Sequence, residues 1–507
     1  MSDFPLATQP STLTPGYYVA VNLLGGQPSP ANGAPRALIM ATKSSAGTIT
    51  ANTQLKQAVS GADEVRTLLG PGTPGHLCAV QLFKAHPLAK VDVISPTVSG
   101  GSSATATVTF GSAPTSNMTI RFWIKGVQFD MPWNVGTSVT DAGEAFELLV
   151  DGLTNKLPCD SNNSSGTVTL TAKFAGPWGN DITLYSQILE GAGGTVTLSG
   201  AAFTGGTTEP SFATALTNSA AVVDYDFIIP CVSNADAQTA AGTCNPGLIE
   251  AHLDSYDSGL SAHLTQQICG LTGALASAIT GANGRNHGPT QFPFCLNGQS
   301  FGCEFAGWEA GRRMLREEVD PACNRIGDHE GTDELVGAFD LGADRPTDAE
   351  IEQALGNGLS IFNYDAQGDI YLVAPITTYS QDASGNTDRR LFYVSGVSGP
   401  YAFTKAMRRI LPVEYEGAKI SDDLGADDEP PPNGVVQIRE VRATIVEIGR
   451  DYVRRGVLDR AKFEAAVTSG DLVLRVNPDN ESQVDIVVPV DVTKPLAKFS
   501  AYTLRRS

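Results

Sequence analysis

Two clusters of charged residues near the end of the chain carry side chains that could do chemistry. The first is acidic, with Asp422 and Asp423 followed closely by three more carboxylates at 427–429. Hard divalent cations prefer clustered carboxylate oxygens, so this segment is a candidate cation site. Its spacing is not that of an EF-hand loop, and three prolines follow it at 430–432. We therefore expect an exposed, solvated acidic loop, with cation binding as the alternative.

The second cluster is basic. The segment 439–462 carries seven basic and four acidic residues within a strongly acidic chain. Four of its side chains could form a basic ridge: Arg450, Arg454, Arg455 and Arg460. One interpretation is a docking surface for an acidic partner, because complementary charge steers association. The other is a solvated helix face, on which the arginines pair with Glu447, Asp451 and Asp459. Both interpretations stay open on the sequence alone.

Familiar catalytic and cofactor-binding motifs are missing from the sequence. It contains no G-x-x-x-x-G-K-[ST], no G-x-S-x-G and no H-E-x-x-H. The Gly-rich run 191–194 does not join a strand to a helix, so we expect a turn there rather than a phosphate-binding loop. The histidines lack metal-ligand spacing and no two cysteines form a C-x-x-C pair. Cys231 and Cys269 lie in apolar runs and predict buried thiols. We expect no enzyme activity, no cofactor and no metal site.

Length and charge limit the classes of partner. The chain has 507 residues and a formal net charge of −20, and this length suggests about three domains. Residues 211–430 carry −19 of that charge, whereas 1–95 and 431–507 each carry +2. An acidic surface repels phosphate, so nucleic acid is a poor primary partner. No run of 18 apolar residues is present, which predicts no membrane insertion. The N-terminus lacks the features of a signal peptide, so we expect synthesis in a cytoplasm.

The elements that would position these residues begin with an α/β pattern. The strand-like run at 37–41, the short helix at 61–69 and the strand at 91–94 predict parallel pairing in a covered sheet. The pattern resumes at 222–230, whose apolar run is typical of a buried parallel strand. Later in this part, Thr347-Asp-Ala-Glu350 predicts a capping box at the start of a helix. The strand-like runs at 359–364 and 369–374 predict a hairpin around Ala366-Gln367-Gly368.

Between these two parts the composition shifts to Ser, Thr and Gly. Strand-like runs recur there at short intervals, at 105–110, 119–129, 167–174, 182–189 and 195–198. A single helix is expected at 141–153. Several of the runs alternate apolar and polar residues, as a half-solvated strand does. We therefore predict a β-rich domain inserted into the α/β domain.

After residue 400 helices dominate again, with Phe403 and Met407 on one apolar helix face and Ile445 and Ile448 on another. Both chain ends carry a lone strand-like segment. The apolar residues of the N-terminal segment are Tyr17, Tyr18, Val19 and Val21, and those of the C-terminal segment are Phe499, Tyr502 and Leu504. An isolated strand is not stable alone, so each arm is expected to join the edge of a sheet.

Together these patterns predict an α/β (α+β) fold with a parallel or mixed sheet, an inserted β-rich domain and extended strand arms at both ends. The expected boundaries are 1–35 for the N-terminal arm, 36–95 and 206–395 for the α/β core domain, 96–205 for the inserted domain, 396–496 for a C-terminal α+β domain and 497–507 for the C-terminal arm.

Six segments match, in the same order, sequence patterns of one known family. Pro15-Gly-Tyr-Tyr-Val19 is similar to its N-terminal P-G-V-Y-V strand. Gly176-Pro-Trp-Gly-Asn-Asp-Ile-Thr-Leu184 resembles its G-x-x-G-N-D-I turn. Pro375-Ile-Thr-Thr-Tyr-Ser-Gln-Asp-Ala-Ser-Gly-Asn-Thr-Asp388 resembles its R-x-I-T-T-Y-Q segment and the G-x-x-D that follows.

The other three matches lie in the last hundred residues. Tyr415-Glu-Gly-Ala-Lys-Ile-Ser-Asp-Asp423 resembles a K-L-A-D-D segment, and Gly456-Val-Leu-Asp-Arg-Ala-Lys-Phe463 a turn followed by a helix. Asn477-Pro-Asp-Asn-Glu-Ser-Gln-Val-Asp-Ile-Val-Val-Pro489 is similar to the strand before the C-terminal arm. The family with this ordered set is the contractile tail sheath proteins of Mu-like bacteriophages. The chain departs from it at Pro375, where the family has Arg, and at Thr493-Lys-Pro495, where it has N-Q-L.

The resemblance implies a structural subunit. Sheath proteins of this kind form hexameric rings stacked helically around a tail tube, and contraction drives the tube through the host envelope for genome ejection. The implied partners are further copies of the chain, the tail tube protein, and the baseplate and tail terminator proteins, with no direct contact to nucleic acid. The implied location is the virion tail, after assembly in the host cytoplasm. We further expect the arms 14–24 and 497–506 to pair with adjacent subunits. Residues 96–205 should lie on the outside of the sheath, and the arginine ridge should face the tube.

Two alternatives stay open. The sheath of a phage-derived bacteriocin or of a contractile injection system would carry the same pattern. A carbohydrate-binding multidomain protein could also combine a β-rich module with an α/β frame. That class needs aromatic and acidic residues gathered in one cleft, and the four tryptophans are scattered along this chain.

Overall fold

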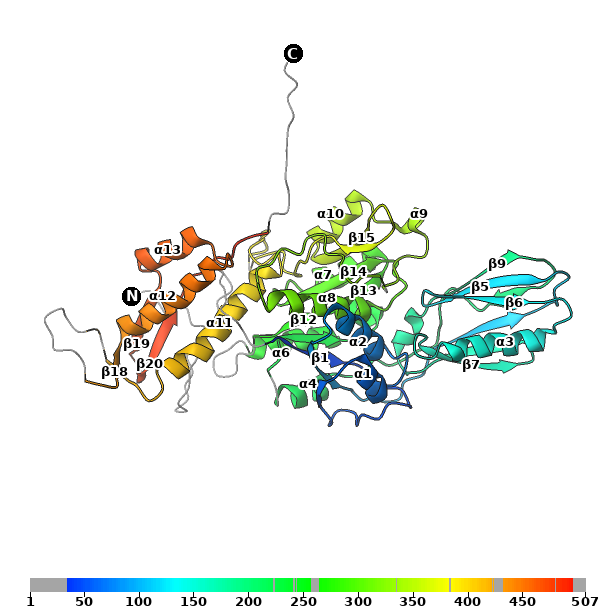
Figure 1. The fold of residues 1–507 in the computed structure, drawn as a ribbon, viewed down its shortest axis with the longest axis horizontal. Helices are drawn as coiled ribbons and strands as arrows, with labels where there is room; N and C mark the ends of the chain where they lie inside the picture. Colours follow the sequence, from blue (N-terminus) through cyan, green and yellow to red (C-terminus); the bar gives the residue numbers. More distant parts are fainter. Residues whose placement is uncertain are drawn as a thin grey trace, which may run out of the picture.

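A mixed sheet runs through the middle of the molecule, and Figure 1 shows a strand-rich part on one side of it and a helical part on the other. The structure is a computed structural model, and it describes residues 34–495 except for 222–223, 240–241, 243, 257–263, 334, 383, 422, 424–431 and 479. Within these residues the sheet has nine strands, in the order β16-β15-β14-β12-β11-β1-β3-β2, with β13 also paired to β14. They are β1 (Arg36–Met40), β2 (Lys56–Val59), β3 (Lys90–Ile94), β11 (Phe227–Pro230), β12 (Gln266–Ile268), β13 (Leu271–Gly273), β14 (Thr290–Leu296), β15 (Leu359–Tyr364) and β16 (Ile370–Leu372).

Parallel pairing joins all the strands between the two edges. β1 lies between β3 and β11 and is parallel to both, as predicted for the strands at 37–41 and 91–94. The edge strands β2 and β16 are antiparallel to their neighbours. β14 is buried along its whole length. This strand was not predicted, because Pro293 interrupts the apolar run and proline is rare in central strands.

Helices cover both faces of this sheet. α2 (Pro74–Ala85) and α8 (Gly302–Glu317) pack together over one face, with α1 (Ala62–Leu69) beside α2. A Cβ atom on Gly307 would lie 2.4 Å from the Cys78 carbonyl oxygen, so glycine is required for this close approach. On this face the Arg313 guanidinium lies over the Phe227 ring. On the opposite face Arg285 lies over the Phe292 ring. Helices α4 (Ala213–Ala220), α5 (Asn234–Ala237), α6 (Asn245–Tyr256), α7 (Leu275–Asn283), α9 (Leu341–Asp344) and α10 (Asp348–Gly356) complete this part.

Two local predictions in this part are confirmed. α10 begins with a reciprocal capping box, in which Thr347 Oγ1 accepts from the Glu350 amide while Glu350 accepts from the Thr347 amide. β15 and β16 form the predicted antiparallel hairpin. Both features depend only on residues close together in the chain, which is why their sequence patterns were sufficient.

The strand-rich region, residues 105–198, forms two antiparallel sheets. Its elements are β4 (Thr105–Phe110), β5 (Met118–Ile124), β6 (Val127–Trp133), α3 (Val139–Gly152), β7 (Cys159–Ser164), β8 (Thr167–Ala172), the 3₁₀ helix η1 (Pro177–Asp181), β9 (Leu184–Glu190) and β10 (Val196–Leu198). α3 fills the space beside the sheets, and its Phe146 ring lies 4.6 Å from that of Phe122 and 5.9 Å from that of Phe110. These rings form the aromatic centre of the region.

The expectation of one continuous strand at 119–129 was wrong. The chain turns at Lys125 and Gly126, and β5 and β6 form an antiparallel hairpin on either side. Both turn residues have positive φ, 51° and 72°, which is the backbone of a two-residue type I′ turn. Lysine is uncommon in this conformation, so the apolar run gave little local signal of the turn.

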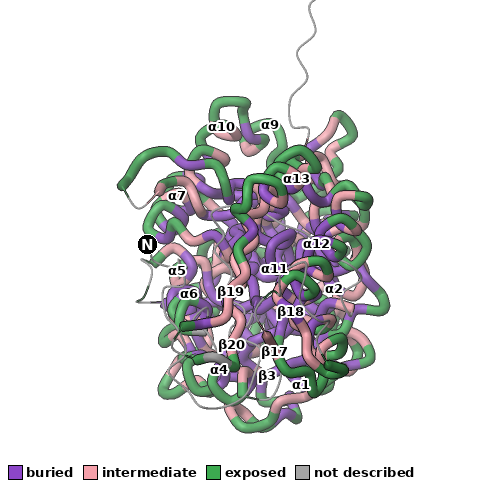
Figure 2. Tube along the Cα trace, turned by 90° about the vertical axis from the view of Figure 1, so that its left-hand side faces the viewer, coloured by how far each residue is buried: buried purple, intermediate pink, exposed green. Residues whose placement is uncertain are grey.

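The helical part packs around its own core. It contains α11 (Ser395–Glu414), β17 (Lys419–Ser421), β18 (Val435–Gln437), α12 (Ile438–Arg454), α13 (Arg460–Ser469), β19 (Val473–Asn477) and β20 (Asn480–Val487). Phe403, Met407, Ile445 and Ile448 are buried, as the two predicted helix faces required, and the structure places all four in one cluster. In Figure 2 the buried residues, including those around α11, lie centrally, and most exposed residues lie in the outer turns and helices.

The predicted arms, and with them Tyr17, Tyr18, Val19, Val21, Phe499, Tyr502 and Leu504, lie outside the described residues. The proposed domain boundaries stay predictions.

In the described part of the chain, no helix is long and apolar enough to cross a membrane.

Candidate functional site

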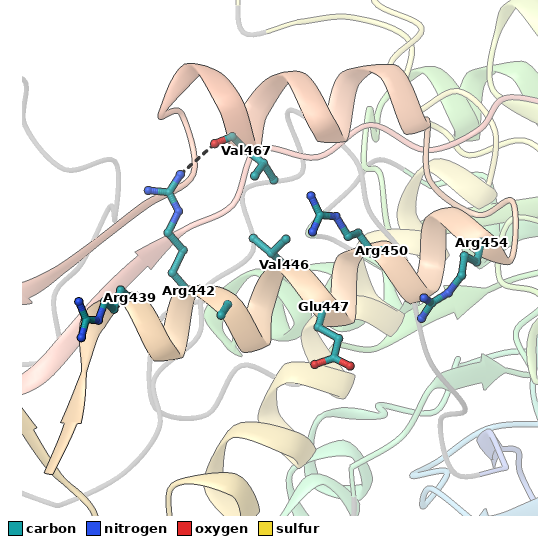
Figure 3. Close-up of a pocket in the computed structure, with 8 residues that line it drawn as sticks. Arg439, Arg442, Val446, Glu447, Arg450, Arg454 and Val467 are labelled. Carbon is teal, nitrogen blue, oxygen red and sulfur yellow. Dashed lines mark hydrogen bonds between the residues drawn. The ribbon is translucent and has the colours of Figure 1, made fainter. Parts of the chain in front are cut away.

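The arginine-rich segment forms the exposed side of α12. Val441, Ile445, Ile448 and Tyr452 are buried on the opposite side, at the spacing of three and four residues that gives a helix one apolar face. The exposed side presents a stripe of basic residues along the helix, which Figure 3 shows in place: Arg439, Arg442, Arg450 and Arg454. The apolar stripe fixes the rotation of α12 against its core, and thereby directs the arginines outward.

These arginines line an open groove of about 520 Å³ beside α13 (Figure 3). Ala443 and Val446 of α12 and Val467 of α13 provide its apolar lining, and Glu447 adds a carboxylate at the edge. The groove therefore combines a small apolar floor with guanidinium groups. Such a surface suits a partner that offers carboxylates together with a short aliphatic side chain.

Several of the groove arginines have partners within the helix pair. Arg450 donates two hydrogen bonds to Glu464 of α13, at 2.9 and 3.0 Å, and this contact lowers the pKa of the Glu464 carboxyl from its ordinary value. The Arg442 guanidinium donates to the Val467 carbonyl oxygen at 2.9 Å. These bonds join α12 to α13 and hold the guanidinium groups along the groove.

The four arginines of the predicted ridge do not all lie together. Arg450 and Arg454 line the groove. Arg454 and Arg455 both form ion pairs with Asp451, at 3.3 and 3.0 Å, as in the solvated-face interpretation. Arg460 is the first residue of α13. The end of α12 therefore has ion pairs of the kind that the solvated-face interpretation predicts. Docking of an acidic partner at the groove stays a prediction.

Sequence reasoning missed Arg439 and Arg442 as members of this site. Their positions could have been found from the spacing, because residues 439, 442, 446, 450 and 454 follow one another at three or four residues and share a helix face. The partner Glu464 could not have been found in this way, since it lies on a different helix. Asp423 contributes locally, because its carboxylate accepts a hydrogen bond from the Arg439 amide at 2.8 Å.

The cysteines form no reactive site. All eight are free, seven are buried and Cys323 is half-buried, which confirms the buried thiols predicted at Cys231 and Cys269. Burial raises the pKa of both thiols well above the ordinary value, so they stay protonated and poorly nucleophilic. Among the residues that the structure describes, no group of three or more His, Cys, Asp or Glu side chains could hold a metal ion. Most of the acidic segment 422–429 lies outside those residues.

The segments that resemble the sheath family make specific structural contacts where the structure describes them. Asp388 accepts a hydrogen bond from the Tyr379 hydroxyl at 2.7 Å and pairs with Arg390. Asn477 donates two hydrogen bonds to the buried Asp485 carboxylate across the β19–β20 hairpin, both at 3.1 Å. These polar residues thus bind each other within turns and hairpins of the framework.

No family model and no curated protein matches this sequence. The chain is similar to solved structures of sheath proteins. The sheath tail protein Lin1278 from Listeria innocua is 14% identical, with a TM-score of 0.45 over 92% of this chain and 93% of that one. A sheath tail protein from Desulfitobacterium hafniense is 11% identical, with a TM-score of 0.44 over 96% and 97%. The contracted PVC sheath of an extracellular contractile injection system is 10% identical, with a TM-score of 0.46 over 98% and 99%.

Proposed function

We propose that this chain is the structural subunit of a contractile tail sheath, of the type found in Mu-like bacteriophages. Subunits assemble into hexameric rings stacked helically around a tail tube, and contraction drives the tube through the host envelope for genome ejection. The observation that carries the proposal is the ordered set of six sequence segments that resemble this family, which spans residues 15–489. Each match alone is short, and their common order over nearly the whole chain makes coincidence a poor explanation.

Self-assembly is supported by the hairpin next to the C-terminal arm. In the described residues β19 and β20 pair only with each other, so the outer backbone groups of both strands are available to an added strand. An extended segment can join such an edge by main-chain hydrogen bonds. We propose that the arms 14–24 and 497–506 make contacts of this kind with adjacent subunits. A contact between different surfaces of identical copies generates a helix when it does not close into a ring.

Tube contact is the role we propose for the arginine surface of α12. The groove residues Arg450 and Arg454, together with the neighbouring Arg455 and Arg460, form a basic surface segment of an acidic chain. A tube wall rich in carboxylates would be attracted to it and repelled by the acidic residues 211–430. The attraction would be strong at low salt and weaker above physiological ionic strength.

Contraction requires two packings of the same subunits. The extended lattice must be higher in free energy than the contracted one and separated from it by a barrier. The free-energy difference per subunit can be modest, because many subunits change together. Arms that stay paired during the change would keep the lattice connected while the folded parts rotate.

Electron microscopy of the negatively stained, purified protein tests the proposal. We expect long hollow cylinders with helical striation, whose diameter distinguishes an extended from a contracted lattice. The tail tube protein should be supplied in a parallel sample, because a sheath that needs a template would otherwise stay disassembled. Uniform small particles at every protein and salt concentration, with and without the tube, would contradict it.

A further inference from the structure

Two segments from the strand-rich side meet at one point beside the carboxyl end of β11. Asp181, the last residue of η1, accepts a hydrogen bond from the Asn234 amide at 2.9 Å. Glu209 lies in the connection that returns from β10 to α4, and its carboxylate bonds to the Ser233 hydroxyl. Ser233 caps α5 and Asn234 begins it, three to four residues after β11. The two carboxylates thus bind consecutive residues of the sheet part of the molecule.

Neutral hydrogen bonds hold the same segments in place. Asn245 of α6 donates to the Pro210 carbonyl oxygen at 2.7 Å and accepts from the Phe212 amide at 3.0 Å. Asn180 and Gly206 exchange two hydrogen bonds, both at 3.0 Å, which tie η1 to the returning connection. This contact, which we call the junction (Asp181, Glu209, Ser233 and Asn234), is therefore flanked by hydrogen bonds that do not titrate and that keep its carboxylates close together.

The charges around the junction are mostly negative. Asp236 of α5 is the third carboxylate, and it accepts hydrogen bonds from the amide and the side chain of Asn245. The neighbouring cation is Arg285, which follows α7 and is paired with Glu250 of α6 at 3.1 Å. Glu209 Oε2 is buried and accepts no hydrogen bond from the residues that the structure describes. An ionised Glu209 is therefore poorly solvated and lies among like charges, which opposes ionisation.

Burial raises the pKa of Glu209 to about 7, and the neighbouring Asp236 and Asp181 add to the shift. Burial likewise raises the pKa of Asp181 to about 6 and moves that of Asp236 upward. A carboxyl group whose pKa is higher in the folded state than in the opened state binds its proton more tightly when folded. The carboxyl group therefore stabilises the closed junction fully at low pH, and this stabilisation is lost as the pH rises through the pKa of the folded state.

We propose that the junction of Asp181 and Glu209 with Ser233 and Asn234 is a pH-sensitive lock that holds the strand-rich region against the central sheet, tighter below neutral pH and looser above it. Protonated Glu209 can exchange hydrogen bonds with Ser233 as a neutral group. Ionised Glu209 repels Asp181 and Asp236 and loses solvation. The lock acts within one folded chain and does not depend on assembly into a sheath.

Hydrogen–deuterium exchange of the full chain between pH 5.5 and 8 tests the lock. The reporter amides are those of Asn234, which donates to Asp181, and Asp236, which donates to Ser233 Oγ. After correction for the intrinsic pH dependence of exchange, we expect protection in the 231–237 segment to fall at least about tenfold over this range, since one pKa unit is a factor of ten in an equilibrium constant. The buried strand β14 serves as the reference, and its protection should change less.

The variant Glu209→Gln keeps the shape of the side chain and removes its titration. We expect it to lose most of the pH dependence at 231–237 and to be better protected than the wild type at pH 8. Glu144→Gln, the same change on the exposed side of α3, should behave like the wild type. Protection that does not change with pH in the wild type would overturn the proposal. An unchanged pH dependence in Glu209→Gln would do the same, and if this variant does not fold, the wild-type series alone decides.

Discussion

Lys125 and Glu304 form a buried ion pair although 179 residues separate them in the sequence. Lys125 occupies the turn between β5 and β6, and Glu304 lies in the first turn of α8, with side chains only 3% and 5% exposed. Glu304 also accepts the Phe301 amide at 2.8 Å, and the Lys125 ammonium lies over the Phe301 ring. The pair therefore joins the strand-rich region to the central part, at a second contact apart from the junction of Asp181 and Glu209.

Removal of one partner of this pair should be costly. Lys125→Met leaves the Glu304 carboxylate buried without its cation, and we expect a loss of about 3 to 5 kcal/mol in the free energy of unfolding. The double variant Lys125→Met/Glu304→Gln should lose less than the sum of the two single changes, because no buried charge is left unpaired. Urea unfolding followed by tryptophan fluorescence measures all three variants.

The matched control is the exposed pair of Arg121 and Asp130 on the same β5–β6 hairpin. Arg121→Met should lower the free energy of unfolding much less than Lys125→Met does, because water screens an exposed charge. Equal losses in the free energy of unfolding for Lys125→Met and Arg121→Met would show that burial of the Lys125–Glu304 pair adds little to stability.

His76 should make the protein less stable in acid. It is buried in α2, and its Nδ1 accepts a hydrogen bond from the Gly72 amide at 3.1 Å. Burial lowers its pKa from 6.5 to about 4, with a further contribution from Arg66. A histidine whose folded pKa is lowered stabilises the fold above its unfolded pKa, and this contribution is lost as the pH falls from about 6.5 towards 4. The shift corresponds to a loss of up to about 3 kcal/mol.

The variant His76→Gln separates this effect from other acid titrations. Glutamine can still accept a hydrogen bond but does not titrate in this range. Urea midpoints measured between pH 7 and 4.5 should fall less steeply in the variant than in the wild type. Parallel curves for the two proteins would exclude His76 as a source of acid sensitivity.

Deletion of residues 1–24 should leave a folded chain that no longer polymerises. The central sheet begins at Arg36, so the described core contacts stay in place. Circular dichroism and the thermal midpoint should stay close to those of the full chain, whereas sedimentation and electron microscopy should find only small species. Normal cylinders formed by the truncated chain would remove the N-terminal arm from the assembly contacts.

Charge reversal on α12 should weaken tube binding and leave self-assembly intact. The double variant Arg450→Glu/Arg454→Glu replaces two groove guanidinium groups with carboxylates. We expect at least about a tenfold loss of affinity in cosedimentation with tail tubes, because each close like-charge contact opposes docking. The matched control is Lys156→Glu, an exposed reversal in the strand-rich region. Unchanged tube binding by the α12 variant, or an equal loss in the control, would contradict a tube-facing role.

Sequence patterns predicted the elements whose signals are local. The apolar runs at 37–41 and 91–94 became the parallel strands β1 and β3, because continuous apolar residues suit a strand covered on both faces. The buried stripe of α12 followed from its helical spacing. The same spacing oriented the arginines of α12 outward, so part of the candidate groove was already contained in the sequence.

Only the tertiary structure decided which distant groups meet. The hairpin turn at Lys125 and Gly126 was missed, since the apolar pattern continues across it. Sequence periodicity reports the face on which a side chain lies, but it does not report the opposing surface. The pairs Lys125–Glu304 and Arg450–Glu464 and the carboxylates Asp181 and Glu209 come together only because separate elements pack in one arrangement. Packing, rather than local sequence, therefore produces the buried pair and the junction, and it completes the groove by bringing α13 beside α12.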